Sequence, residues 1–432
     1  MPSVDSAGDR RPRQLHPLLW VTSSYFVMAA VGMTLGSSSN TMLLNLGATA
    51  KQAAIYASLI TAWYSLKPLW APVLEMFRTK KFFVLVTQLG CAAGFVGAAL
   101  ALSPEGSRWS FLGLLAAMGL LGATMDIATD GVYVTTLGPR EQARYTGFQS
   151  MSWQLGALFA VGPLVSVTGL LRSAGYDYAS AWRRVYLGLA LVIVLVALHH
   201  AWALPAGSRA ASAPTSLGDA ARTFGDAIRS LFAKRGIWAM LAFAFLYRTS
   251  QGFLDKIGQS FMIDAPARGG LGLDNTVYGL LSGTVGIAGV IVGSLLGGFA
   301  VARFGLKRSL FWLCVALNLP NALYLWLAVA RPGDPWLIGA AVTFEKFWFG
   351  VGSVGHMIYL MQQLAPGRYQ TAHYAFATAL LSLCYTFTGI LSGAIQDRLG
   401  YAPFFVFVMI ATLPSFLVTL AAPFHVATGE GG

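Results

Sequence analysis

The sequence predicts an all-α integral membrane protein of twelve transmembrane helices, arranged as six spans, a polar linker and six more spans. Of the 432 residues, 56% are hydrophobic and 11% are charged, whereas an ordinary soluble domain carries roughly 25% charged residues. Apolar windows of about 20 residues, each long enough to cross a hydrocarbon core as a helix, recur along the whole chain. The bilayer is therefore the expected solvent of this protein.

Glycine, proline and charged residues delimit the expected spans. The first six lie at 17–43, 51–75, 82–103, 109–137, 145–171 and 182–204, and the next six at 237–263, 274–302, 309–330, 335–362, 369–395 and 401–422. The expected domains are a tail at 1–16, an N-terminal bundle at 17–204, a linker at 205–236, a C-terminal bundle at 237–424 and a tail at 425–432.

The linker carries an amphipathic pattern. Its apolar residues recur at steps of four and three positions, and basic residues accompany them, as in an interfacial helix. The apolar residues are Leu217, Ala221, Phe224, Ile228 and Leu231. The basic residues are Arg222, Arg229, Lys234 and Arg235. A helix on the membrane surface is one interpretation, and a plain tether with some helicity is the other.

The distribution of basic residues predicts the orientation. If the N-terminus is cytoplasmic, 17 lysines and arginines fall in cytoplasmic segments and 8 on the opposite side. The positive-inside rule then places both termini in the cytoplasm of a multi-pass inner-membrane protein. In this count, the segment GAIQDRLG around Asp397 lies on the outer side.

Several classes of function are disfavoured. The formal net charge of +12 arises from short clusters between apolar runs, with no aromatic-studded basic domain to receive nucleic acid. The cysteines Cys91, Cys314 and Cys384 lie inside apolar segments, at no spacing typical of a metal site or a disulfide framework. No nucleophile elbow, Walker loop, HExxH or CxxC motif is present, so we expect no enzyme, cofactor or metal.

Eight ionisable residues lie inside the expected spans. Leaving all of them charged against lipid would cost on the order of 20 kcal/mol, so they are expected to face one another, water or a ligand. They are four acids and four bases: Asp126, Asp130, Asp255, Glu345, Lys67, Arg248, Lys256 and Lys346.

The segment GATMDIATDGVY places Asp126 and Asp130 four residues apart, which stacks both carboxylates on one helix face. Repulsion between like charges at that spacing favours binding of a proton at one of them, so the pair is a candidate proton carrier. The alternative is that both acids pair with bases of neighbouring helices and fix the packing.

Polar residues of the seventh and tenth spans are candidate ligand contacts. Arg248 can bind a carboxylate or phosphate through its planar fork, and Gln251 lies on roughly the same helix face; an internal salt bridge of Arg248 is the alternative. Glu345 is a further candidate for proton coupling, and Lys346 points about 100° away from it. His356, about three turns beyond Glu345, relays protons in one interpretation and is a packing residue in the other.

Two short loops resemble the signature of the major facilitator superfamily. GFAVARFGLKR, with Arg303, Lys307 and Arg308, has the basic residues of that signature, and Ala302 stands where its acid is expected. The matching loop LKPLWAPVLEMFRTKK contains the further gating candidates Glu75, Arg78 and Lys80 but lacks the leading glycine.

The chain also resembles the AmpG-like branch of that superfamily, which includes muropeptide permeases and acetyl-coenzyme A transporters. The resemblance rests on LKPLWAPVLE, GATMDIATDGVY, GGLGLDNTVYGLLSGTVG, GLKRSLFWLCVALNLPNALY, RYQTAHYAFATALLS and SGAIQDRLGYAPFF. It implies the major facilitator fold, in which two pseudo-symmetric six-helix bundles surround a cavity lined by spans one, four, seven and ten.

The same resemblance implies a monomeric, proton-coupled importer of a cell-wall sugar-peptide (muropeptide) or related oligosaccharide that works by alternating access. Siderophore or acyl-coenzyme A carriers are the alternatives within the fold. Ser38 and Asn40 on the first span are candidate partners for a hydroxylated solute, or they mark the outer helix end. A membrane receptor without transport is the alternative from another class.

Overall fold

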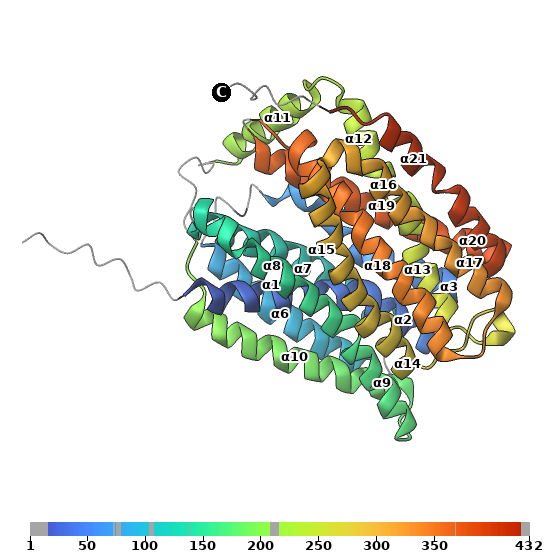
Figure 1. Ribbon diagram of the computed structural model, residues 1–432. Coiled ribbons are helices and arrows are strands. Elements are labelled where there is room, and N and C mark those ends of the chain that lie inside the picture. The colour runs from blue at the N-terminus through green and yellow to red at the C-terminus, as the bar shows by residue number, and fades with distance from the viewer. Residues whose placement is uncertain are drawn as a thin grey trace, which may run out of the picture.

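The computed structural model describes residues 16–424, except 72, 73, 75–78, 103–107, 138, 208–215 and 368. Two helical bundles, drawn from blue to green and from yellow to red, lie against each other (Figure 1). Short π-helical or 3-10 turns interrupt five of the described crossings, and the two 3-10 turns among them contain a proline, Pro68 or Pro320.

The N-terminal bundle contains six crossings. They are α1 (Pro17–Met33) with η1 (Thr34–Ser38) and α2 (Ser39–Asn45); α3 (Ala50–Thr61) with α4 (Trp63–Leu66) and η2 (Lys67–Leu69); α6 (Lys80–Ala101); α7 (Arg108–Thr136); α8 (Pro139–Val161) with α9 (Pro163–Ser173); and α10 (Tyr178–Ala203).

The C-terminal bundle contains six more, preceded by the linker helix α11 (Leu217–Phe232). They are α12 (Ile237–Leu246) with α13 (Thr249–Ile263); α14 (Asn275–Tyr278) with η4 (Gly279–Val285) and α15 (Gly286–Phe304); α16 (Leu306–Asn318) with η5 (Leu319–Asn321) and α17 (Ala322–Ala330); α18 (Pro335–Tyr359) with η6 (Leu360–Leu364); α19 (Gln370–Leu399); and α20 (Tyr401–Ile410) with α21 (Leu413–Leu420). The short turn η3 (Pro266–Arg268) precedes α14.

Length and composition suit these helices to a bilayer. Within the described residues, ten helices are long and apolar enough to cross a membrane. The number is eleven if the bent pair of helices Ala221–Phe232 and Ile237–Ile263 is counted as one span. The remaining crossing is the second, which is interrupted at Ala62 and by the 3-10 turn at Lys67. Twelve crossings therefore form the fold, as the sequence predicts.

Successive crossings run in opposite directions, so the molecule has two ends. We call the end at which α1 begins, and to which α11 belongs, the linker end. The opposite end, which holds residues 46–49, 174–177 and 264–274, is the far end. Within the N-terminal bundle α1 packs on α8 and α6 on α7 and α10, whereas in the C-terminal bundle α18 packs on α15 and α16.

The linker helix α11 lies on the C-terminal bundle. Ala227 and Leu231 on its apolar face are buried there, and Ser230 Oγ lies 2.9 Å from His373 Nε2 of α19. Two ion pairs on the exposed face, Arg222 with Asp219 and Arg229 with Asp226, follow i,i+3 spacing. Of the apolar stripe that suggested a membrane-surface helix, Leu231 is thus buried against protein, Phe224 and Ile228 are half-buried, and Ala221 is exposed.

Candidate transport site

The two acids of α7 have different partners. Asp126 forms an ion pair with Lys67 of η2, and about a fifth of each side chain is exposed. Lys67 reaches α7 because the second crossing changes from α-helix to a 3-10 turn at this residue, immediately before Pro68. The pair neutralises one of the two negative charges of α7.

Asp130 lies one helical turn nearer the linker end than Asp126. Tyr25 of α1 donates a hydrogen bond from its hydroxyl to Asp130 Oδ1 at 2.6 Å, and the Tyr25 ring packs edge-on against Tyr133. Asp130 is exposed, and no described lysine or arginine forms an ion pair with it. Asp130 is therefore an accessible carboxylate whose charge is balanced less directly than that of Asp126.

Arg248 lies at the break between α12 and α13, where the backbone leaves helical geometry. One guanidinium nitrogen, Nη2, donates to the carbonyl of Ser353 at 2.9 Å, and the group lies 5.5 Å from the centre of the Phe349 ring. Its Nε is buried and has no hydrogen-bond partner among the described residues. Within those residues Arg248 pairs with no carboxylate, so the internal salt bridge that sequence reasoning offered as an alternative is not found there.

Gln251 and Glu345 belong to a buried polar network. Gln251 Nε2 lies 2.7 Å from Asn321 Oδ1, 3.0 Å from the Leu317 carbonyl and 3.4 Å from Glu345 Oε1. The second carboxylate oxygen of Glu345 has no hydrogen-bond partner in the described structure. It lies 3.9 Å from Lys346 Nζ, so these two sequence neighbours interact weakly although their helix positions diverge.

Asp255 and Lys256 form a second ion pair between sequence neighbours. Their charged atoms lie 3.0 Å apart, with 30% and 9% of the side chains exposed. All eight ionisable residues predicted inside the spans are thus placed in the structure, and six of them join in three pairs. The other two, Asp130 and Arg248, belong to opposite bundles.

Ser38 and Asn40 are buried in contacts between helices. Ser38 donates to the Ala160 carbonyl at 2.8 Å. Asn40 Nδ2 lies 3.3 Å from the Lys256 carbonyl and 3.2 Å from Gln259 Oε1, so it joins the two bundles. Both residues lie inside the first crossing, which continues to Asn45, so the structure places them neither at the helix end nor on an exposed surface, and their contact with a solute stays a prediction.

Further polar contacts between the bundles lie at the far end. Asn45 and Asn275 are hydrogen-bonded at 2.6 Å, and Lys51 forms an ion pair with Asp397 at 3.0 Å. Asp397 therefore lies at the same end as Lys51, in agreement with the twelve-span count. One apolar core also includes residues of both bundles, such as Met42 and Phe261.

Glycines allow the backbones to meet at the same end. A Cβ at Gly283 would lie 2.4 Å from the Val161 carbonyl oxygen, and one at Gly279 would lie 2.4 Å from Ser166 Oγ. Residues of η4 thus touch the junction of α8 and α9 without room for a side chain. Glycine at both positions thus allows this close contact between the bundles.

His356 lies inside the C-terminal bundle. It is fully buried, its ring stacks on Tyr247 at 5.2 Å, and its Nε2 lies 3.1 Å from the Ala244 carbonyl. This environment is that of a packing residue. The structure does not bring His356 into the Gln251–Glu345 network.

The gating candidates lie near the linker end. Lys80 is the first residue of α6 and is buried, whereas Arg303, Lys307 and Arg308 are exposed around the turn between α15 and α16. The other two candidates, Glu75 and Arg78, lie outside the described residues.

Sequence reasoning missed several polar residues of these networks. Tyr25, Asn45, Asn275, Asn318 and Asn321 all form side-chain hydrogen bonds between spans. Each is a polar residue inside or at the end of an apolar run. A search for uncharged polar residues within the spans, beside the search for charges, would have found them.

In this helical membrane protein, charged and polar side chains meet between two six-helix bundles. This arrangement is the architecture of a membrane transporter. The family model of the Major Facilitator Superfamily matches residues 21–390. The chain therefore belongs to the Major Facilitator Superfamily.

Individual proteins show the same relationship. The chain is 24% identical over 375 residues to the anhydromuropeptide permease of Escherichia coli strain K12, covering 84% of this chain and 71% of the permease. It is 22% identical over 418 residues to the protein named AmpG 4 of Rickettsia conorii, covering 91% and 95%. The crystal structure of a D-xylose-proton symporter superposes with a TM-score of 0.67 at 13% identity, covering 93% and 96%.

Proposed function

We propose that this protein is a proton-driven importer of an anhydromuropeptide-like sugar-peptide across a bacterial inner membrane, with both termini in the cytoplasm. The similarity to an anhydromuropeptide permease over most of the chain supports the substrate class. The excess of basic residues in the segments of the linker end supports the orientation, which makes the far end periplasmic.

Asp130 is the proposed proton carrier. The observation that supports this role is the difference between the two acids of α7: Lys67 compensates Asp126, whereas Asp130 is exposed and accepts a hydrogen bond from Tyr25. A carboxylate with a neutral partner gains more from protonation than one that is already paired with a base. Asp126 and Glu345 remain candidates for a secondary role in coupling.

Arg248 is the proposed contact for an anionic group of the substrate, such as a peptide carboxylate. The absence of a carboxylate partner among the described residues leaves its charge available to a ligand, and a planar guanidinium can bind a carboxylate through two hydrogen bonds. Gln251 and Lys346 are neighbouring polar candidates. Broken helices at mid-membrane are a recurring feature of transporter binding sites, and Arg248 lies at such a break.

The polar and glycine contacts at the far end support a conformation closed toward the periplasm. In the proposed cycle these contacts open, substrate binds between the bundles, and Asp130 takes up a proton from outside. Closure of the far end and deprotonation toward the cytoplasm then accompany release.

The test is uptake of radiolabelled anhydromuropeptide into proteoliposomes with an imposed proton gradient of either sign. The variants are Asp130→Asn and a matched control, Asp226→Asn, which changes an acid of the linker helix outside the spans. We expect gradient-driven accumulation in the wild type and the control. Asp130→Asn should lose accumulation but retain exchange of labelled for unlabelled substrate, because its amide imitates a permanently protonated acid.

Two results would contradict the proposal. Accumulation by Asp130→Asn at the wild-type level would exclude Asp130 as the proton carrier. Absence of uptake and exchange by the folded wild-type protein under every gradient would exclude the substrate and direct the search to siderophores, acyl-coenzyme A and other oligosaccharides.

A further inference from the structure

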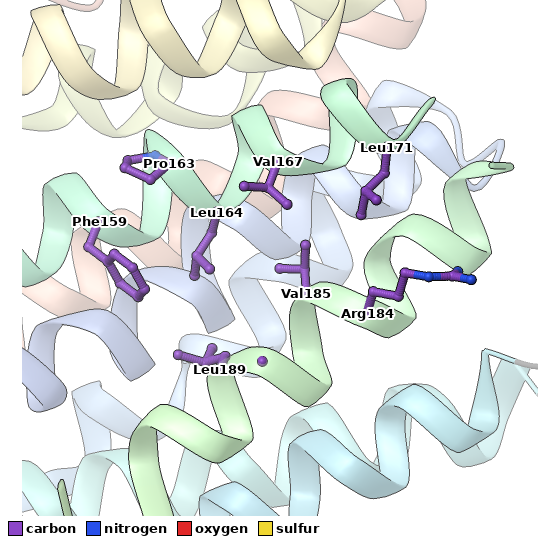
Figure 2. A pocket seen from close by; sticks show the side chains of 9 residues that line it. Phe159, Pro163, Leu164, Val167, Leu171, Arg184, Val185 and Leu189 are labelled. Atoms are coloured by element: carbon purple, nitrogen blue, oxygen red, sulfur yellow. The ribbon is translucent and has the colours of Figure 1, made fainter. Parts of the chain in front are cut away.

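A groove of about 260 Å³ lies between α9 and α10 on the surface of the N-terminal bundle. Its walls are almost entirely apolar, and Arg184 is the one charged residue among those that line it; the others are Phe159, Pro163, Leu164, Val167, Leu171, Val185, Gly188 and Leu189. Figure 2 shows Arg184 and Leu171 toward one end of the groove and Phe159 and Leu189 toward the other.

The groove faces the hydrocarbon region of the bilayer. Large apolar residues around it are exposed, including Leu170 at 57% and Leu191 at 60%. Both belong to spans that are apolar enough to cross a membrane. In this position the groove is in contact with lipid rather than with water.

The depth of the groove matches the upper part of one leaflet. Helix α10 has 26 residues, which at 1.5 Å per residue exceed a hydrocarbon core of roughly 30 Å by about three residues at each end. Arg184 is the seventh residue of α10, about one turn inside the core boundary, where a long side chain still reaches the headgroup layer. Gly188 lies about one turn deeper, among the acyl chains.

Basic residues surround the headgroup end of the groove. The segment from Arg172 to Arg184 contains three arginines, Arg172, Arg183 and Arg184, against one acid, Asp177. Arg184 lies over the Tyr176 ring at 3.9 Å and donates to the Ser180 carbonyl at 3.0 Å. These contacts orient its guanidinium at the helix end while leaving donors available.

Nearby acids are already engaged. Asp177 caps α10 by accepting a hydrogen bond from the Ser180 backbone at 2.7 Å, and this bond, together with the neighbouring arginines, lowers the pKa of Asp177. Asp274 caps α14 through the backbone amides of Thr276 and Val277. The segment 172–184 therefore carries a net positive charge at the level of the lipid phosphates.

We propose that this groove binds a phospholipid with an anionic headgroup, whose phosphate contacts Arg184 and whose acyl chain lies against Gly188 and Leu189. Apolar walls at acyl-chain depth and arginines at phosphate depth match the two parts of such a lipid. Gly188 provides the space, because a Cβ placed there would meet no atom within 4 Å. The inference is independent of the transported substrate.

The test is native mass spectrometry of the full-length protein released from detergent with phosphatidylglycerol or phosphatidylcholine of identical acyl chains. We expect the wild type to retain phosphatidylglycerol more strongly. Arg184→Gln should weaken that retention by about tenfold, as expected for the loss of a charge-assisted hydrogen bond, and should leave phosphatidylcholine unchanged. Gly188→Leu should reduce retention of both lipids, because its side chain fills the groove.

Matched controls separate this site from the general lipid surface. Arg331→Gln removes an arginine from another loop of the far end, and Gly298→Leu adds a side chain on α15 where a Cβ also meets no atom within 4 Å. Equal lipid retention in wild type, Arg184→Gln and Gly188→Leu would overturn the proposal, and so would equal losses in the controls. Dissociation of a dimer by Gly188→Leu would also overturn it, because the groove would then be an interface between two copies.

Discussion

The glycine contact at the far end predicts that Gly283→Ala prevents closure of that end. The added Cβ would lie 2.4 Å from the Val161 carbonyl oxygen and 2.5 Å from the Gly162 backbone. Comfortable carbon contacts begin at about 3.5 Å, so the bundles would have to separate by about 1 Å at this point. Both obstructing groups are backbone atoms, and no rotation of a side chain relieves the clash.

The size of the effect follows from the cost of overpacking. An extra methyl group in a well-packed contact costs about 1–3 kcal/mol, which shifts the ratio of open to closed molecules by about 5- to 150-fold. Alanine in place of glycine also favours the helix by about 1 kcal/mol. Loss of closure is therefore expected without loss of folding.

Labelling of a buried residue toward the far end measures closure. Thr41 of α2 is fully buried, so Thr41→Cys should react slowly with a membrane-impermeant maleimide added from the far-end side. The native cysteines are buried as well and should contribute little background. Gly283→Ala should accelerate labelling of Thr41→Cys and slow substrate transport in proportion.

Gly298→Ala is the matched control. Gly298 belongs to α15, which follows η4 in the same crossing, and a Cβ placed there would meet no atom within 4 Å. It should leave both labelling and transport unchanged. Equal labelling rates in the Gly283→Ala and Gly298→Ala proteins would refute the steric argument.

Three further predictions concern charged groups. Lys51→Gln removes an exposed ion pair with Asp397; such pairs contribute about 0.2–1 kcal/mol, so far-end labelling should rise by less than about fivefold. Lys67→Met leaves Asp126 without its partner and should destabilise the purified protein by up to about 3 kcal/mol, whereas Lys67→Met with Asp126→Leu should recover most of the loss in thermal melting. Arg248→Lys keeps the charge but loses the planar fork, so KM for an anionic substrate should rise about tenfold in uptake assays.

Each of these has a result that contradicts it. Labelling in Lys51→Gln as fast as in Gly283→Ala would mean that the ion pair, rather than the glycine contact, closes the far end. A double variant as unstable as Lys67→Met alone would remove the ion pair as the cause of instability. An unchanged KM in Arg248→Lys, with Arg331→Lys as the control, would place the anion elsewhere.

Hydropathy and charge alone predicted the twelve-span fold and placed Asp126 and Asp130 on one face of α7. This succeeded because crossing a bilayer imposes length and polarity limits that each span shows by itself. The same energetic limit predicted that charges inside the spans would find partners, and Lys67 with Asp126 is one such pair.

The functions of individual polar residues depended on docking between helices, which periodicity does not encode. Asn40 looked available to a solute but joins the two bundles, and Glu345 interacts with Gln251 of a span that lies distant in the sequence. The helix α11 carried a membrane-surface pattern, yet Leu231 is buried against protein. In each case a neighbouring helix, rather than water or lipid, covers the residue.

The charges inside the spans are divided unequally between the bundles. Of the eight ionisable residues predicted inside the spans, Lys67, Asp126 and Asp130 of the N-terminal bundle sum to one net negative charge in their ordinary ionised forms. Arg248, Asp255, Lys256, Glu345 and Lys346 of the C-terminal bundle sum to one net positive charge. Opposite charges on facing bundles attract strongly where little water intervenes.

Protonation of Asp130 would cancel the negative side of this attraction. An anionic group bound at Arg248 would cancel the positive side. Either event alone leaves one bundle with an unbalanced charge in a region of low dielectric. Both events together leave neither bundle with an unbalanced charge. The proton and the anionic substrate should therefore bind more favourably as a pair. Under the proposed function, coupling between proton and solute would require no direct contact between Asp130 and the substrate, because it would arise from the charge balance between the two bundles.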